Sequence, residues 1–206
     1  MEKKYYWGLF FLFVQALVIL RNSLDGYNYY FWFCDFAPIV FSIAFFIGNK
    51  NIIKGIINFG LIPQIIFLFD LIYTIINGTS LLGVHPSLLQ FFSFSVLSTI
   101  FIHLTTIFAL MITIKTKPTK KTVFYSIIFM FLVYLVTLIF TPSSEGINFV
   151  YSTGDLLKSY NFLIPNIIFL WPFLTFLFLI LPTQGVQYFL YKFFKRKITL
   201  KPKKSN

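Results

Sequence analysis

The chain has 206 residues, of which 58% are hydrophobic, 22% aromatic and only 11% charged. Soluble chains carry about 25% charged residues, and a soluble domain of this size cannot bury so much apolar surface. Composition therefore excludes a water-soluble globular protein. The net charge of +11 is explained by membrane topology and attraction to anionic membrane lipid, so no nucleic acid is expected as a partner.

Six apolar runs have roughly the 17–25 residues that a transmembrane helix needs. They are continuous rather than alternating, which disfavours an outer-membrane barrel. No small-residue cleavage site follows the first run, so we expect an uncleaved helix rather than a signal peptide. We therefore predict an all-α fold, a polytopic bundle of about six transmembrane helices that forms one integral membrane domain over residues 1–206. The runs are about Tyr5–Leu20, Tyr29–Gly48, Ile52–Ile76, Leu88–Ile114, Thr122–Phe140 and Asn161–Leu181.

The basic residues predict the orientation of these spans. With six spans, 15 of the 17 basic residues fall on the side of both termini, and only Arg21 and Lys158 fall on the other side. Basic residues near span ends stay in the cytoplasm, so both termini are expected to be cytoplasmic. Within residues 184–206, the mixed aromatic and basic stretch Gln184–Lys197 is predicted to lie at the inner interface, followed by a cytoplasmic tail. The abundance of Phe, Ile, Lys and Asn favours an AT-rich prokaryotic genome, hence a prokaryotic plasma membrane.

Among the reactive or ionisable side chains inside the apolar runs, four are candidates for chemistry, namely Cys34, Asp35, Asp70 and His103. An ionisable side chain in a membrane costs about 2.5–3.5 kcal/mol on insertion scales, so each is a candidate functional residue. At 1.5 Å per residue, Cys34 and Asp70 lie about 8 and 9 Å below the outer surface, and His103 lies near mid-membrane. Their depths permit one shared site.

Two prolines, Pro38 and Pro63, are expected to break helical hydrogen bonds close to these candidate residues. Pro38 cannot donate a hydrogen bond to the carbonyl of Cys34, four residues earlier, so we expect a kink and a freed carbonyl beside the thiol. Pro63, next to Gln64, has the same effect in the third span. Membrane helices tolerate such breaks where side chains, water or neighbouring helices satisfy the freed group.

Cys34 is the only cysteine, which excludes an intramolecular disulfide and disfavours a zinc site. A lone cysteine is often a small buried apolar residue, and a reactive one needs a base or cation nearby. His103 is the candidate base within the membrane. The two aspartates could orient His103, carry protons or pair with an amide such as that of Gln64; alternatively, they form a buried polar network that fixes helix packing. No metal, nucleotide or haem motif is present, so no cofactor is expected.

Three short segments suggest a family. Tyr30–Pro38, with the sequence Tyr-Phe-Trp-Phe-Cys-Asp-Phe-Ala-Pro, resembles a cysteine motif of the YwaF-like integral membrane proteins. Ile102-His103-Leu104 is similar to their membrane histidine, and Gly146-Ile147-Asn148-Phe149 to their asparagine-rich segment. The resemblance covers roughly residues 29–150. That family includes a eukaryotic cysteine-dependent phospholipid acyltransferase, and it is distantly similar to androgen-induced hydrolases that use threonine and histidine.

The resemblance implies acyl transfer or ester cleavage on a lipid that enters from the outer leaflet. Cys34 would attack the acyl ester, and His103 would take the thiol proton and return it to the leaving alcohol. Asp35 or Asp70 would hold the imidazole in the useful tautomer.

Two amides are candidates for binding the substrate, since either Gln64 or Asn148 could donate a hydrogen bond to the oxyanion. Two other functions stay open. Intramembrane Asp and His with broken helices are also typical of a proton-coupled transporter, although no pseudo-symmetric pair of segments is present. In a non-enzymatic membrane scaffold the same polar groups would only pack helices.

Overall fold

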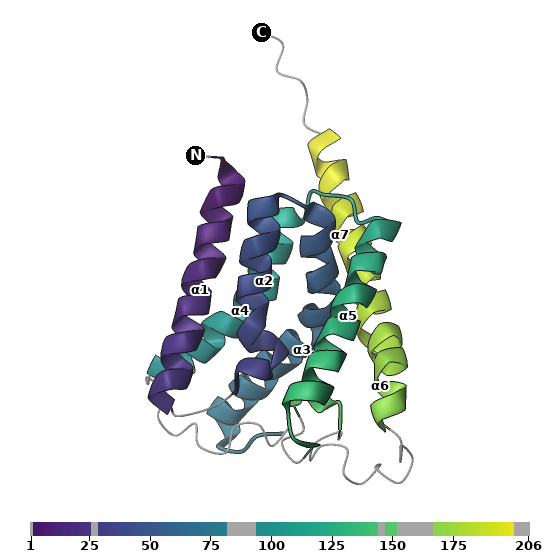
Figure 1. Cartoon of the computed structure of the whole chain (residues 1–206). Helices are drawn as coiled ribbons and strands as arrows, with labels where there is room; N and C mark the ends of the chain where they lie inside the picture. The colour runs from purple at the N-terminus through teal and green to yellow at the C-terminus, as the bar shows by residue number, and fades with distance from the viewer. Residues whose placement is uncertain (1, 26–28, 82–93, 144–146, 152–166, 200–206) are drawn as a thin grey trace.

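The computed structural model describes residues 2–25, 29–81, 94–143, 147–151 and 167–199, and every regular element in these ranges is helical (Figure 1). The predicted all-α fold is confirmed. In chain order the elements are α1 (Lys3–Asp25), the 3₁₀ turn η1 (Tyr29–Phe31), α2 (Phe33–Ile47), α3 (Lys50–Asn77), α4 (Phe94–Thr113), α5 (Lys120–Phe140), the 3₁₀ turn η3 (Ile147–Phe149), α6 (Ile167–Thr175), the π-helical segment η5 (Phe176–Ile180) and α7 (Leu181–Thr199).

Five helices in the described ranges are long and apolar enough to cross a membrane, as a multi-pass membrane protein requires. They are α1, α3, α4, α5 and the continuous helix formed by α6, η5 and α7. The apolar helix α2 has only 15 residues, because the predicted second span begins with a 3₁₀ turn and ends at Gly48, whose positive φ of 76° caps the helix. The predicted starts of the fourth and sixth spans, and Lys158, lie outside the described residues.

The helices stand side by side, and α3 occupies the centre, where it contacts α2, α4, α5 and α7 (Figure 1). Aromatic side chains from four helices fill the core around α3. Phe33 of α2 lies 4.8 Å from Phe59 of α3, measured between ring centroids, and Phe129 of α5 lies 5.7 Å from Phe59. Trp171 of α6 completes the group at 6.1 Å from Phe59. Such large rings contribute most of the buried contact area.

Two glycines allow α3 to approach its neighbours closely. A Cβ atom at Gly60 would lie 2.3 Å from the ring of Phe33, and one at Gly55 would lie 3.1 Å from the backbone nitrogen of Ser126 on α5. Small residues at such points let helix backbones come together in membranes, where apolar burial alone gives no preference for helix contact over lipid contact.

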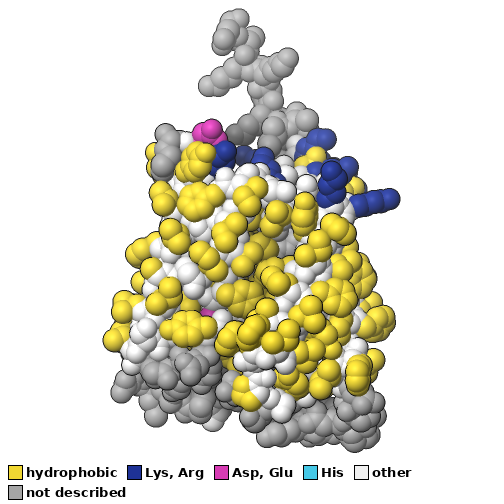
Figure 2. Space-filling model, in the orientation of Figure 1, with side chains coloured by type: hydrophobic (Ala, Val, Ile, Leu, Met, Phe, Trp, Pro, Cys, Tyr) yellow, Lys and Arg dark blue, Asp and Glu magenta, His cyan; other side chains and the backbone are white. Residues whose placement is uncertain are grey.

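Hydrophobic and basic side chains occupy different parts of the molecular surface. Hydrophobic side chains cover the sides of the bundle in the view of Figure 2, while Lys and Arg gather at the end that carries the N-terminus and α7. This end is called the basic end below. Its cytoplasmic placement stays a prediction.

Two segments differ from the expected boundaries. Helix α1 continues beyond Leu20 to Asp25, so Arg21 lies in a helix rather than in a loop. The sixth helix continues through Gln184–Lys197 as α7, where we expected a separate interfacial stretch. The physical reason is that Thr183 and Gln187 of α7 are buried in the bundle, and Gln187 bonds to α3.

Candidate functional site

Asp35 forms a buried ion pair with Arg21. The carboxylate Oδ2 of Asp35 lies 2.6 Å from Nη2 of Arg21, and both side chains are more than nine-tenths buried. Asn22 contacts both partners, since its Nδ2 donates to Asp35 Oδ2 at 3.0 Å and its Oδ1 accepts from Arg21 Nη2 at 2.7 Å. Charge-assisted hydrogen bonds of this kind offset the cost of placing two charges in an apolar bundle. Thus α1 and α2 are joined by an ionic contact that the sequence did not predict.

Thr99 connects this pair to His103. The hydroxyl of Thr99, on α4, accepts a hydrogen bond of 3.2 Å from Arg21 Nη1. The carbonyl of the same residue lies 2.8 Å from Nδ1 of His103. A carbonyl can only accept, so Nδ1 carries the hydrogen, and in the neutral ring Nε2 holds the lone pair. The ring also stacks on Phe67 of α3, with centroids 3.5 Å apart and planes at 6°. Both the orientation and the tautomer of His103 are therefore fixed.

Cys34 lies beside the ion pair and is partly buried. Its Sγ is 3.7 Å from Oδ1 of the adjacent Asp35. The thiol side chain packs against an apolar cluster of Val14, Val18 and Ile102, and Ile102 directly precedes His103. The structure thus links Cys34 to His103 through a chain of contacts that runs from Asp35 through Arg21 and Thr99.

Pro38 lies inside α2, which continues on both sides of it, and α1 contacts the backbone next to it. The backbone N–H of Ile39, which follows Pro38, donates to Oε1 of Gln15 at 3.0 Å. This N–H is a different group from the Cys34 carbonyl, whose release by Pro38 stays a prediction.

Gln64 lies one helical turn from Phe67 on α3 and contacts α4 at Thr106, one turn from His103. Its Oε1 accepts from the Thr106 hydroxyl at 2.5 Å and from the Thr106 backbone N–H at 3.2 Å. The side chain is only 1% exposed. Its Nε2 has no partner among the described residues. Gln64 therefore presents a buried amide donor at the contact between α3 and α4, and a bound group could use this donor.

Asp70 contacts the segment that follows α3. Asn148 contacts η1 and the start of α2. The carboxylate of Asp70 accepts from the Leu81 backbone N–H and from the Ser80 hydroxyl, each at 2.7 Å. The Asn148 side chain accepts from the Phe33 backbone N–H at 2.8 Å. It donates to the Phe31 carbonyl and to the Thr137 hydroxyl, each at 2.9 Å, so both hydrogens of its Nδ2 are used within the protein. The Asn148 contacts hold the first turn of α2 to η1 and α5, and the Asp70 contacts hold the chain just after α3.

Sequence reasoning missed Arg21, Asn22 and Thr99. A signal for Arg21 was present, because a carboxylate within a membrane helix requires a counter-ion, and Arg21 is the basic residue nearest to Asp35 in the sequence. Thr99 carries no such signal, since hydroxyl residues are common in membrane helices. Within the described ranges, no three His, Cys, Asp or Glu side chains gather in a way that could hold a metal ion.

No family model matches the chain, and neither a curated protein nor a solved structure was found to match it.

Proposed function

We propose that this protein is a lipid acyltransferase or esterase within the membrane, with Cys34 as nucleophile and His103 as general base. The observation that carries the proposal is the fixed imidazole. The Thr99 carbonyl holds Nδ1 at 2.8 Å, and Phe67 stacks on the ring. In the proposed reaction Nε2, the other ring nitrogen, exchanges the proton as a general base.

The chemistry is a double displacement. Nε2 of His103 takes the proton of the Cys34 thiol, and the thiolate attacks the carbonyl carbon of an acyl ester. The tetrahedral oxyanion collapses by breaking the bond to the alcohol oxygen, which receives the proton from Nε2. The resulting thioester is then attacked by water or by a second lipid hydroxyl. That step releases the acyl chain and restores the thiol.

Among the predicted amides, Gln64 is better suited than Asn148 to bind the oxyanion. Nε2 of Gln64 is buried and has no partner among the described residues, whereas Nδ2 of Asn148 already donates twice. A donor of this kind contributes about 10²–10³-fold to the rate when it meets the developing charge.

Asp35 is paired with Arg21, and Arg21 in turn contacts Thr99, so we assign these residues to positioning rather than to proton transfer.

A reconstituted assay tests the proposal. Purified protein in vesicles is supplied with a phospholipid that carries a fluorescent acyl chain, and release or transfer of that chain is measured together with hydroxylamine-sensitive acylation of Cys34. We expect Cys34→Ala to abolish acylation and turnover, and His103→Gln to lower turnover by about 10²–10⁴-fold, the usual contribution of a general base.

The matched control is Phe101→Ala, a truncation on the same helix at an exposed position, which should leave turnover unchanged. Full turnover by Cys34→Ala would refute a cysteine nucleophile. An unchanged rate of Cys34 acylation in the His103→Gln variant would refute the role of His103 as general base.

A further inference from the structure

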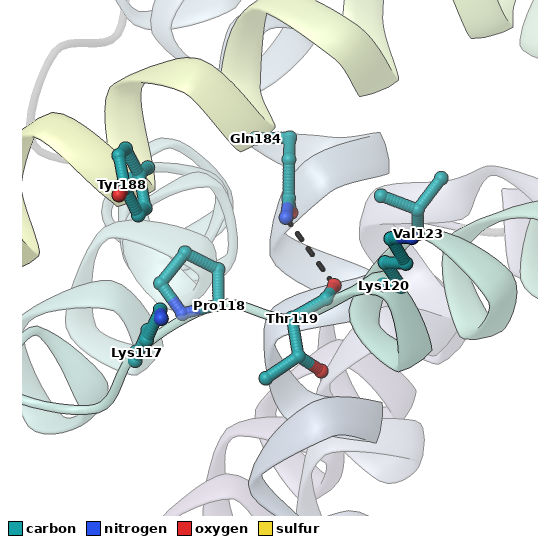
Figure 3. A pocket seen from close by; sticks show the side chains of 7 residues that line it. All are labelled: Lys117, Pro118, Thr119, Lys120, Val123, Gln184 and Tyr188. Carbon is teal, nitrogen blue, oxygen red and sulfur yellow. Dashed lines mark hydrogen bonds between the residues drawn. The ribbon is translucent and has the colours of Figure 1, made fainter.

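A groove of about 480 Å³ lies at the basic end, between α7 and the segment that leads into α5. Figure 3 shows Gln184 and Tyr188 of α7 above Lys117, Thr119 and Lys120. Nε2 of Gln184 donates to the Thr119 carbonyl at 3.4 Å, and this contact joins the two walls. Because the helices alternate in direction, this groove is at the opposite end of the bundle from Cys34.

The groove is cationic. Lys117 and Lys120 are exposed and line it, and no carboxylate is present among its lining residues. A third ammonium group, that of Lys192, lies 4.7 Å above the ring of Tyr188. At this end of the described structure the carboxylate of Glu2 is paired with Lys4 instead, at 3.2 Å. The groove therefore presents positive charge with an aromatic wall, which suits an anionic group at a membrane interface.

A buried network extends from the groove to a second cation. Oε1 of Gln184 accepts from Nδ2 of Asn58 at 2.8 Å, and Oδ1 of Asn58 accepts from Nε2 of Gln187 at 2.6 Å. Oε1 of Gln187 then accepts from Nζ of Lys54 at 3.0 Å. Lys54 is fully buried, and its described partner is this neutral amide.

One feature of this network favours a bound anion. A buried ammonium without a carboxylate is costly, because an amide oxygen supplies only partial negative charge. A negative group in the groove would lower the electrostatic cost of Lys54 through the polarised amides.

We propose that this groove binds the phosphate of an anionic glycerophospholipid from the leaflet at the basic end. Lys117 and Lys120 contact the phosphate, and Gln184 forms the floor. The acyl chains lie along the apolar outer surface beside the groove, where Phe124 of α5 is 60% exposed and Phe189 of α7 is 67% exposed. Basic pockets between membrane helices are the usual sites for such headgroups.

Native mass spectrometry of the full chain in detergent, titrated with phosphatidylglycerol or with phosphatidylcholine, tests this site. We expect phosphatidylglycerol to bind at least tenfold more tightly than phosphatidylcholine. The double variant Lys117→Gln/Lys120→Gln should lower phosphatidylglycerol affinity about tenfold, and Lys117→Arg/Lys120→Arg should retain it.

The matched control is Lys3→Gln/Lys50→Gln, which removes the same charge from two exposed lysines at the same end but outside the groove. An equal loss of phosphatidylglycerol affinity in Lys117→Gln/Lys120→Gln and in Lys3→Gln/Lys50→Gln would overturn the proposal in favour of a diffuse surface potential. Displacement of the lipid by millimolar inorganic phosphate alone would overturn a lipid ligand in favour of a free anion. Gln184→Leu is a further variant that leaves the net charge unchanged, and unaltered lipid affinity in it would refute the proposed floor.

Discussion

Asp35 occupies an apolar helix because Arg21 compensates its charge from the neighbouring helix. The guanidinium contacts the carboxylate at 2.6 Å and also reaches Asn22 and Thr99. A single arginine therefore connects three helices, α1, α2 and α4. Its planar fork makes this possible, whereas a lysine supplies one point charge.

The ion pair gives a direct prediction for stability. Asp35→Leu or Arg21→Leu alone should lower the free energy of unfolding by about 3–5 kcal/mol, because each leaves an uncompensated buried charge. The double variant should be much less destabilised than the sum of the two, since no charge is then left unpaired. Unfolding in mixed micelles with increasing dodecyl sulfate, analysed as a double-mutant cycle, measures the coupling. Additive losses would show that the two side chains do not interact.

Arg21→Lys serves as the control in that cycle, because it keeps the positive charge and loses the contacts to Asn22 and Thr99. It should be intermediate in stability. If His103 depends on this network, the same variant should also lower turnover in the acyl-transfer assay without removing Cys34 acylation.

At the scale of the elements, Asn148 joins segments that are far apart in the chain. Its side chain bonds to η1, to the start of α2 and to α5, while its backbone carbonyl accepts from Nε1 of Trp171 on α6 at 3.0 Å. It adopts a φ of 53°, the left-handed region that Asn tolerates better than most residues. Trp32, the N-cap residue of α2, makes no side-chain capping bond, so Asn148 supplies a cap to α2 from a distant segment.

Asn148→Gly should therefore keep the backbone conformation and lose the cap. We expect a loss of stability of about 1–3 kcal/mol for each buried group left unsatisfied, measured by unfolding in micelles, together with faster hydrogen exchange at the Phe33 amide. Asn148→Asp is the matched variant, since it keeps the acceptor for Phe33 and removes both donors. If turnover of the Asn148→Asp variant in the acyl-transfer assay falls by more than its lost stability explains, the oxyanion role that the sequence suggested for Asn148 would be favoured.

The elements also show what the sequence could predict. The third span was predicted within two residues, because a long and mostly apolar run is bounded by polar and glycine residues at both ends. The extension of α7 could not be predicted, since Gln184 and Gln187 are polar and become compatible with a buried helix only through Lys54 and Asn58 on α3. The closeness of Cys34 to Asp35 follows from their adjacency in the sequence. The link from this pair to His103 depends on the contact between Arg21 and Thr99, which are far apart in the sequence and meet only in the folded chain.

At the scale of the whole molecule, charge separates along the bundle axis, and this separation predicts its orientation. Single cysteines can be placed on a Cys34→Ala background at Lys115, just after α4, and at Asn77, the last residue of α3, and labelled with a membrane-impermeant maleimide. Both positions are exposed, and they are at opposite ends of the bundle because α3 and α4 run in opposite directions (Figure 1). In intact cells we expect labelling of Asn77→Cys only, and of Lys115→Cys after permeabilisation, because basic ends stay cytoplasmic. The reverse pattern would refute the predicted topology, and the Cys34→Ala parent controls for background labelling.

The shortness of α2 makes the bundle uneven in height. Its 15 residues measure about 22 Å at 1.5 Å per residue, against about 30 Å for the hydrocarbon core of a bilayer. Since α2 meets α3 in a tight turn near the basic end, the shortfall lies at the other end, directly above Cys34. There the 3₁₀ turn η1 takes the place of further α-helix, and the Asn148 side chain accepts from the Phe33 N–H and donates to the Phe31 carbonyl. Non-helical backbone within a bilayer is tolerated where protein groups satisfy it, so this end of α2 is closed by protein contacts instead of by a longer helix.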